Sequence, residues 1–119
     1  NKAAFDIEIK PHSIVVADRG YCDYGLLNHW DSNNVFYVGR HKDNIRYRTI
    51  EELPLPKQHT QNVLMDESIE FGLPAAKEKF PKRLKRIAVW NDEHGFVIEL
   101  LTNNFTLAAS TIAKLYKAR

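Results

Sequence analysis

Short apolar runs, each ended by polar or turn-forming residues, mark the elements at the start of the chain. Residues 14–17 (Ile-Val-Val-Ala) and 35–38 (Val-Phe-Tyr-Val) are short and rich in β-branched residues, which predicts two buried strands. Between them, residues 23–30 place large apolar side chains at helical spacing, which predicts a helix. Strands joined through a helix in this way are parallel, with a right-handed crossover in nearly all cases. The pattern therefore predicts part of an α/β sheet.

The pattern changes after residue 44. Residues 45–50 alternate between apolar and polar side chains, which predicts a half-buried strand. Residues 51–80 are uneven and contain several prolines, so we expect an irregular, mostly antiparallel region with a candidate strand at 68–71. Residues 86–90 and 96–101 flank a five-residue loop that contains Gly95, which predicts a hairpin.

The last segment of the chain predicts an amphipathic helix. Its apolar positions approximate a period of 3.6 residues: Leu107, Ala108, Ile112, Leu115 and Tyr116. Asn104 or Thr106 is expected to cap this helix. The helical pattern has not ended at the last residue, and the first residue is not Met, so we expect an internal fragment of a longer protein.

Composition narrows the class of protein. A chain of 119 residues with 44% apolar residues has enough apolar side chains for a core, which argues against disorder. Cys22 is the only cysteine, so an internal disulfide is excluded and a reducing compartment such as the cytosol is expected. No apolar run approaches the roughly 20 residues that a membrane span requires. The five histidines show no paired spacing, so a zinc site is not expected.

Positive charge is concentrated in one stretch, although the formal net charge is only +2. Residues 77–86 contain a single acid and six basic residues: Lys77, Lys79, Lys82, Arg83, Lys85 and Arg86. Such a patch would attract DNA in a salt-sensitive and sequence-independent way, and we take Arg83, Lys85 and Arg86 as candidate DNA contacts. The alternative is a solvated face with no ligand.

Asp18 is the strongest candidate for chemistry. The first apolar run stops at this residue, and Arg19 and the turn-forming Gly20 follow, which places the carboxylate at the carboxyl end of a strand. Acids in this position often bind metals, and the equally plausible alternative is a turn cap or an ion pair with Arg19. Arg40 and Lys42 follow the second parallel strand and are expected at the same sheet edge, either touching DNA phosphate or in a solvated loop.

Four blocks of sequence, in order along the chain, carry a family resemblance. They are residues 16–21 (Val-Ala-Asp-Arg-Gly-Tyr), 36–42 (Phe-Tyr-Val-Gly-Arg-His-Lys), 101–104 (Leu-Thr-Asn-Asn) and 112–119 (Ile-Ala-Lys-Leu-Tyr-Lys-Ala-Arg). Together they resemble the DDE transposases of bacterial insertion sequences, in the IS-four-like group whose third acid lies in a Tyr-x-x-Arg-x-x-x-Glu helix. The segment 51–85 matches only in general character.

The resemblance implies an α/β fold that is part of a ribonuclease-H-like catalytic core, with a mainly antiparallel β insertion. Residues 1–44 would be the core segment with the second catalytic Asp, residues 45–101 the insertion, and residues 102–119 the start of the helix that carries the third acid. Asp18 matches the second acid of the triad. The first acid would precede this sequence and the third would follow it, so the fragment itself is expected to be inactive.

The resemblance also implies the roles of other residues. Tyr116 and Arg119 match the first two members of the helical signature and would hold a DNA phosphate near the scissile bond, although Tyr116 could instead be a core residue. Trp90 would stack on an extruded base, and its alternative is also a place in the core.

For the parent protein, the resemblance implies a dimeric enzyme that cleaves and joins DNA at the ends of an insertion sequence and at its target. Asp18 would bind Mg²⁺ or Mn²⁺ in the complete enzyme, whereas no metal is expected on the fragment. No membrane partner is expected, and the compartment would be the cytoplasm, in association with the nucleoid. Two alternatives remain: a DNA-binding module without catalysis that uses the basic hairpin, and a ribonuclease-H-like nuclease without transposition.

Overall fold

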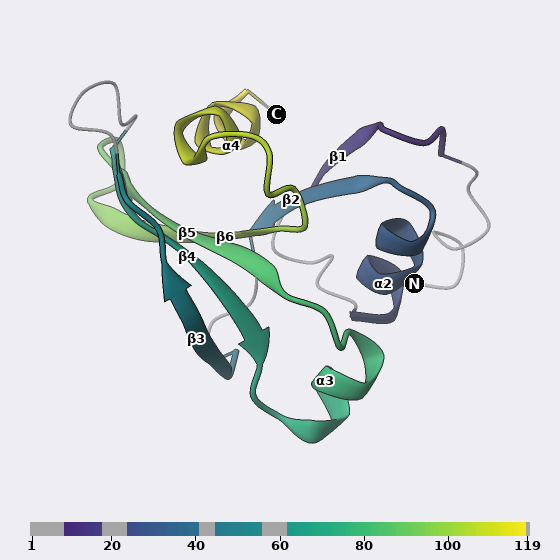
Figure 1. Cartoon of the computed structure of the whole chain (residues 1–119). Coiled ribbons are helices and arrows are strands. Elements are labelled where there is room, and N and C mark those ends of the chain that lie inside the picture. The colour runs from purple at the N-terminus through teal and green to yellow at the C-terminus, as the bar shows by residue number, and fades with distance from the viewer. Residues whose placement is uncertain (1–8, 18–23, 41–44, 56–61, 119) are drawn as a thin grey trace.

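The chain forms one mixed α/β sheet with helices on both faces (Figure 1). The computed structural model describes residues 9–17, 24–40, 45–55 and 62–118. Its elements, in chain order, are β1 (Ile14–Ala17), α2 (Tyr24–Ser32), β2 (Phe36–Arg40), β3 (Tyr47–Glu52), β4 (Val63–Phe71), α3 (Pro74–Lys79), β5 (Leu84–Asn91), β6 (Phe96–Thr102) and α4 (Ala109–Lys117). None of the helices in these ranges has the length and apolar character needed to cross a membrane.

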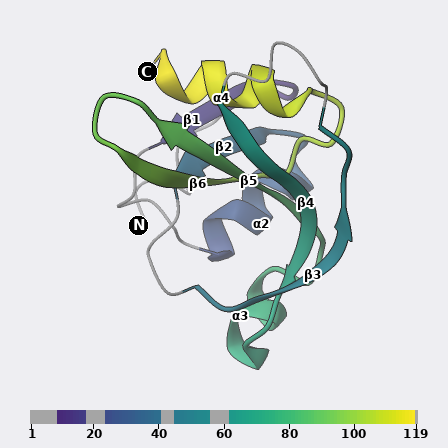
Figure 2. The ribbon, with the colours of Figure 1, turned by 90° about the vertical axis from the view of Figure 1, so that its left-hand side faces the viewer.

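The sheet has the strand order β1-β2-β6-β5-β4-β3. The β1 and β2 strands are parallel, and the other neighbouring strands are antiparallel. Helix α4 covers one face, while α2 and α3 lie on the other (Figures 1 and 2). This arrangement confirms the α/β class, the parallel pair at the start of the chain and the antiparallel character of the later strands.

Each face of the sheet has its own apolar core, because neighbouring residues of a strand point to opposite faces. On the side of α2 and α3, Tyr37 packs with the helix residues that the sequence predicted to be buried: Leu26, Leu27 and Trp30. On the side of α4, Val38 packs with Ile87, Leu100 and Ile112. The alternation within β2 therefore separates the two cores.

The middle of the chain is more regular than its pattern predicts. The β4 strand spans nine residues instead of only 68–71, and α3 is a helix that the uneven pattern did not indicate. The β4 strand is paired on both sides and carries the buried charged residues Asp66 and Glu67, which interrupt the apolar pattern of a central strand. Pro74, which argued for an irregular region, occupies the first turn of α3, where its missing N–H costs nothing.

Strands from residues 45–101 are part of the same sheet as β2, since Thr102 at the end of β6 pairs with Val38. The hairpin predicted near residues 86–101 is confirmed as β5 and β6. The division at residues 44 and 101 into core and insertion stays a prediction.

Helix α4 begins later than expected and without a side-chain cap. Its N-cap is Ala108, so the prediction that Asn104 or Thr106 caps it is wrong. Asn104 instead uses its Oδ1 to accept hydrogen bonds from the backbone N–H groups of Thr106 and Leu107, both at 2.9 Å. The side chain of Asn104 therefore closes a turn ahead of the helix.

Asn103 continues the ladder between β6 and β2 with its side chain. Its Oδ1 accepts from the backbone N–H of Tyr37 at 2.7 Å, and its Nδ2 donates to the carbonyl of Val35 at 3.0 Å. The same Nδ2 lies 3.2 Å from Oδ1 of Asp31 in α2. One amide thus replaces a peptide unit and ties the end of β6 to β2 and α2.

Replacing Asn103 by Leu is expected to lower the free energy of unfolding by about 2–3 kcal/mol, because partly buried backbone groups of Tyr37 and Val35 lose their partner. Urea denaturation of the chain measures this change. The matched control is Asn33→Ala, which removes one exposed hydrogen bond to the carbonyl of His29 and should cost less than about 0.5 kcal/mol. Equal losses in the two variants would contradict the role given to Asn103.

Candidate nucleic-acid interface

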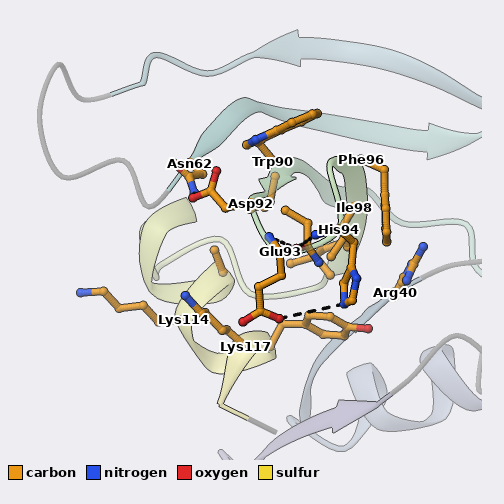
Figure 3. A pocket seen from close by; sticks show the side chains of 15 residues that line it. Arg40, Asn62, Trp90, Asp92, Glu93, His94, Phe96, Ile98, Lys114 and Lys117 are labelled. Atoms are coloured by element: carbon orange, nitrogen blue, oxygen red, sulfur yellow. Dashed lines mark hydrogen bonds and ion pairs between the residues drawn. The ribbon is translucent and has the colours of Figure 1, made fainter.

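A pocket of about 610 Å³ lies between the end of the β5–β6 hairpin and α4 (Figure 3). We call it the hairpin pocket. Its apolar wall consists of Val89, Ile98, Leu100 and Ala113. Its polar and aromatic lining comes from β2, β5, β6, α4, the hairpin loop and the residue before β4: Arg40, Asn62, Trp90, Asn91, Asp92, Glu93, His94, Phe96, Lys114, Tyr116 and Lys117. Segments far apart in the sequence therefore meet here.

The turn between β5 and β6 is fixed by its own residues. Oδ1 of Asn91 accepts from the backbone N–H groups of Glu93 and His94, at 3.0 and 3.2 Å. Gly95 has a φ of 69°, a left-handed conformation that glycine adopts without strain, and its N–H bonds to the carbonyl of Asn91. These local bonds hold the loop side chains in place at the pocket.

Three cations line the hairpin pocket: Arg40 at the end of β2, and Lys114 and Lys117 on α4. Within the ranges that the structure describes, none of them forms an ion pair. Arg40 and Lys114 lie on opposite sides of the pocket in Figure 3. Cations without acidic partners, around an apolar wall, suit a ligand that combines an anionic group with a flat apolar part, as a nucleotide unit does.

The acids at the pocket have partners of their own. Asp92 accepts a hydrogen bond from Nδ2 of Asn62 at 2.8 Å. Glu93 lies 4.0 Å from Nε2 of His94, and both side chains are largely exposed. The negative charge of the hairpin loop is therefore directed at its neighbours in the loop and in the segment before β4, while the three cations have no such partner among the described residues.

Arg40 is held in a stack of side chains. Its guanidinium carbon lies 5.3 Å from the centroid of the Phe96 ring. The His94 ring stacks on the same Phe96 with a centroid distance of 5.8 Å and an interplanar angle of 22°. Phe96 of the hairpin thus contacts the end of β2, and His94 stacks on Phe96.

Trp90 is exposed, so the alternative that placed it in the core is wrong. The residue is 40% accessible to solvent. It pairs with Val97 across the hairpin, and strand alternation places both on the face opposite to Val89 and Ile98. An accessible indole ring at the edge of the pocket is available for stacking, which stays a prediction.

Tyr116 is buried on α4, where it belongs to the same core as Ile112 and also lines the hairpin pocket. Only 5% of the residue is accessible to solvent. The structure therefore places Tyr116 in the core, as the alternative had it, and leaves its predicted contact with DNA untested.

Lys85 and Arg86 do not belong to an exposed basic patch, and this part of the expectation is wrong. Nζ of Lys85 lies 3.2 Å from Oδ2 of Asp66 and donates to the carbonyl of Leu107 at 3.3 Å. Its side chain is only 4% exposed. Strand alternation places the side chain of Lys85 on the α4 face of the sheet. There it links β4, β5 and the segment before α4.

Arg86 lies on the opposite face and is also buried. Its Nη1 donates to Oε1 of Glu67 at 3.1 Å, and its Nη2 forms an ion pair with Glu99. The guanidinium lies 4.9 Å from the centroid of the Tyr47 ring. Both Arg86 and Glu67 have side chains less than 10% exposed, so their charges compensate each other inside the protein. In this conformation Arg86 offers no donor to DNA.

Two further lysines of the basic run are paired on the surface, whereas Arg83 is exposed. Nζ of Lys82 lies 2.5 Å from Oδ2 of Asp31, and Lys77 lies 3.4 Å from Glu70. The pKa of Glu70 is lowered mainly by the hydrogen bond from Arg48 and to a lesser degree by Lys77. Ion pairs thus account for much of the charge that the sequence concentrates in residues 77–86, and Arg83 stays a predicted DNA contact.

Asp18, Lys42 and Arg119 lie outside the described residues, so their predicted roles are not tested. The strand before Asp18 is described: Ala17 ends β1 and pairs with Gly39, next to Arg40. Within the described ranges, no three side chains of His, Cys, Asp or Glu come together as a metal site would require. These ranges alone therefore supply no complete set of ligands for a divalent cation.

Sequence reasoning missed several residues of the hairpin pocket. Lys114 and Lys117 are three positions apart in the final helix, and this spacing could have indicated one basic helix face. Phe96 gave no signal, because its contact with Arg40 joins residues more than 50 positions apart, and His94 takes part only by stacking on Phe96. Asn62 precedes β4 in the stretch whose pattern was uneven.

Comparisons with known proteins agree with one another. The profile of the family described as "Transposase DDE domain" matches residues 3–119. The chain is 27% identical over 106 residues to the "Probable transposase for insertion sequence element IS5377" of Geobacillus stearothermophilus, covering 89% of this chain and 27% of that protein. It is 29% identical over 115 residues to the "Putative transposase y4zB" of Sinorhizobium fredii, covering 95% of this chain and 32% of that protein. No solved structure matches.

Proposed function

The chain belongs to the family of transposase DDE domains, and on this premise we propose that it acts in DNA transposition as part of an enzyme that cleaves and joins DNA strands. The observation that carries the proposal is the family match over residues 3–119, almost the whole sequence. The chain spans less than a third of the length of the two relatives, so the activity belongs to a larger protein. Within it, residues 1–44 and 102–119 would be core segments and residues 45–101 the insertion.

We propose that Asp18 is the catalytic and metal-binding residue of this chain. It directly follows β1, whose parallel neighbour β2 ends at Arg40, so the strand ends of the α/β unit define this edge of the sheet. A carboxylate suits Mg²⁺ or Mn²⁺, which prefer oxygen ligands. Asp18 would hold such a cation, and the chemistry supplied there would be activation of the attacking oxygen and stabilisation of the leaving oxygen of a phosphodiester. The remaining acids of the triad would come from outside this chain.

DNA is the proposed partner, and the hairpin pocket is the proposed contact surface. Arg40 and Lys42, next to the strand ends, would bind backbone phosphate, and Tyr116 and Arg119 on the final helix would bind a phosphate near the scissile bond. Trp90 offers its accessible ring to a base, and Arg83 adds an exposed charge. We further propose that the protein acts as a dimer on DNA in the bacterial cytoplasm.

A joining assay tests the proposed function. The full-length protein that contains this chain is incubated with Mg²⁺, a supercoiled plasmid and DNA fragments that carry the ends of its insertion sequence. We expect concerted joining of two ends to the plasmid. Cleavage without any joined product would favour the nuclease alternative, and salt-dependent binding without cleavage would favour the DNA-binding module.

A further inference from the structure

Phe96 contacts two other side chains that line the hairpin pocket. Arg40 contacts the Phe96 ring from β2, and His94 stacks on the same ring from the hairpin loop (Figure 3). Phe96 is the first residue of β6, and it is 38% exposed. Arg40 is the last residue of β2 and pairs with Leu100 of β6. The two strands therefore fix both backbones, and the stack joins their side chains.

The stack restricts an arginine that has no other partner in the part of the chain that the structure describes. The backbone of Arg40 is held by the ladder with β6, but its guanidinium makes no ion pair or hydrogen bond with a described residue. An arginine side chain without contacts samples many rotamers, and ordering it on binding costs free energy. Contact with an aromatic face reduces this cost, because the side chain is already ordered before a ligand arrives.

The contact of Arg40 with Phe96 involves no hydrogen-bond acceptor, since its partner is an aromatic ring. A guanidinium that lies over a ring uses its planar face, whereas its N–H donors project from the edge of the plane. Those donors form the fork that matches two oxygens of a phosphate. Arg40 can therefore stack on Phe96 and bind a phosphate at the same time. The contact with Phe96 would orient the guanidinium toward the phosphate.

The surroundings of the stack favour an anion. Lys114 and Lys117 line the same pocket and have no ion pair among the described residues. Of the two acids in the loop, Asp92 accepts from Asn62, and the side chain of Glu93 is 80% exposed and lies 4.0 Å from Nε2 of His94. The described acids therefore leave the charge of Arg40 uncompensated.

We propose that Phe96 is a positioning residue for Arg40: through the stack with His94, the β5–β6 hairpin sets the orientation in which the Arg40 guanidinium meets a backbone phosphate of DNA. The proposal rests on DNA being the ligand of this protein. In this proposal the hairpin contributes to phosphate recognition by orienting Arg40, and it does so without a positive charge of its own.

The test is a double-mutant cycle on DNA affinity, measured with the full-length protein and a labelled duplex over a range of salt concentrations. Arg40→Ala should weaken the Kd about tenfold and lower the magnitude of the salt slope by about one, because one phosphate contact is lost. Phe96→Leu should weaken the Kd about two- to fivefold with an unchanged salt slope, because the charge stays and only its orientation is lost. Phe96→Tyr keeps the ring and should bind like the wild type.

The cycle separates positioning from a merely structural role. In the Arg40→Ala background, Phe96→Leu should have no further effect on the Kd. Phe105→Leu is the matched control, because Phe105 is 49% exposed in the segment before α4 and lines no part of the pocket. Equal weakening by Phe96→Leu with and without Arg40, or loss of affinity in Phe96→Tyr, would overturn the proposal.

The outcome is independent of the joining assay. A protein that joins DNA ends but shows no coupling between Phe96 and Arg40 keeps the proposed function and overturns this inference. A protein that joins no ends but shows the coupling retains the positioning role on a DNA-binding module. Absence of any effect of Arg40→Ala on the Kd would overturn the inference as well, since there would be no phosphate contact to orient.

Discussion

Replacing Asp18 by Asn is expected to reduce DNA cleavage by the full-length protein by at least about a thousandfold, while its affinity for DNA stays within a few fold of the wild type. The carboxylate and the carboxamide have nearly the same size, so the strand end is not expected to be disturbed. The amide carries no charge, however, and is a poor replacement for a carboxylate on a divalent cation. The loss should therefore fall on the chemical step and not on binding.

The measurement is single-turnover cleavage of a labelled insertion-sequence end, with the Kd determined in parallel on the same DNA. The matched control is Asp92→Asn, the same chemical change at an acid of the hairpin loop whose partner is Asn62. This control should cleave within a few fold of the wild type. Cleavage by Asp18→Asn at the rate of the control would refute the assignment and support the alternative in which Asp18 caps a turn or pairs with Arg19.

The first α/β unit could be predicted from the sequence because its pattern is local. The apolar run of β1 and the helix face with Leu26, Leu27 and Trp30 each depend on residues close together in the chain. The hairpin of β5 and β6 follows from two apolar strands and a loop that contains Gly95 for the same reason. Burial agrees with the pattern for α2 and β2. The prediction that β1 is a buried strand is wrong, because β1 stands at one end of the strand order and its residues are exposed or only half-buried.

The charged residues of β4 and β5 could not be placed in the same way. In the sequence, Lys85 and Arg86 continue a run of basic residues and look like a surface. In the structure, the neighbouring strand β4 supplies acids to both residues: Glu67 pairs in register with Arg86, and Asp66 forms an ion pair with Lys85. A buried charge is tolerated only with a partner, and that partner lies some 20 positions away in the chain. The distinction between a basic patch and an internal network therefore depends on strand register, which the pattern alone does not provide.

Only some residues of the candidate site could be predicted from the sequence. Arg40 was predicted because it follows a strand, and Trp90 because the family resemblance implies an aromatic residue that stacks on an extruded base. The role of Phe96 depends on the pairing of β2 with β6, which brings together segments separated by the whole region 41–95. No local signal marks a contact of this kind.

The buried network around Arg86 is expected to contribute strongly to stability. Replacing Arg86 by Met should lower the free energy of unfolding by about 3–5 kcal/mol, because the carboxylate of Glu67 would then be buried without its cation. Met fills a similar space along the Tyr47 ring, so most of the loss should come from charge and not from a cavity. Urea denaturation of the chain, followed by tryptophan fluorescence, measures the change.

Arg48→Met is the matched control for this measurement. Arg48 forms a cross-strand ion pair with Glu70, but its side chain is 70% exposed, so the loss should be below about 1 kcal/mol. The double variant Arg86→Met with Glu67→Leu should recover most of the stability lost in the single variant, because no unpaired charge is left in the interior. The proposed network would be contradicted if Arg86→Met were as stable as the control and also bound DNA more weakly with a smaller salt slope. That result would support the original prediction that Arg86 contacts DNA.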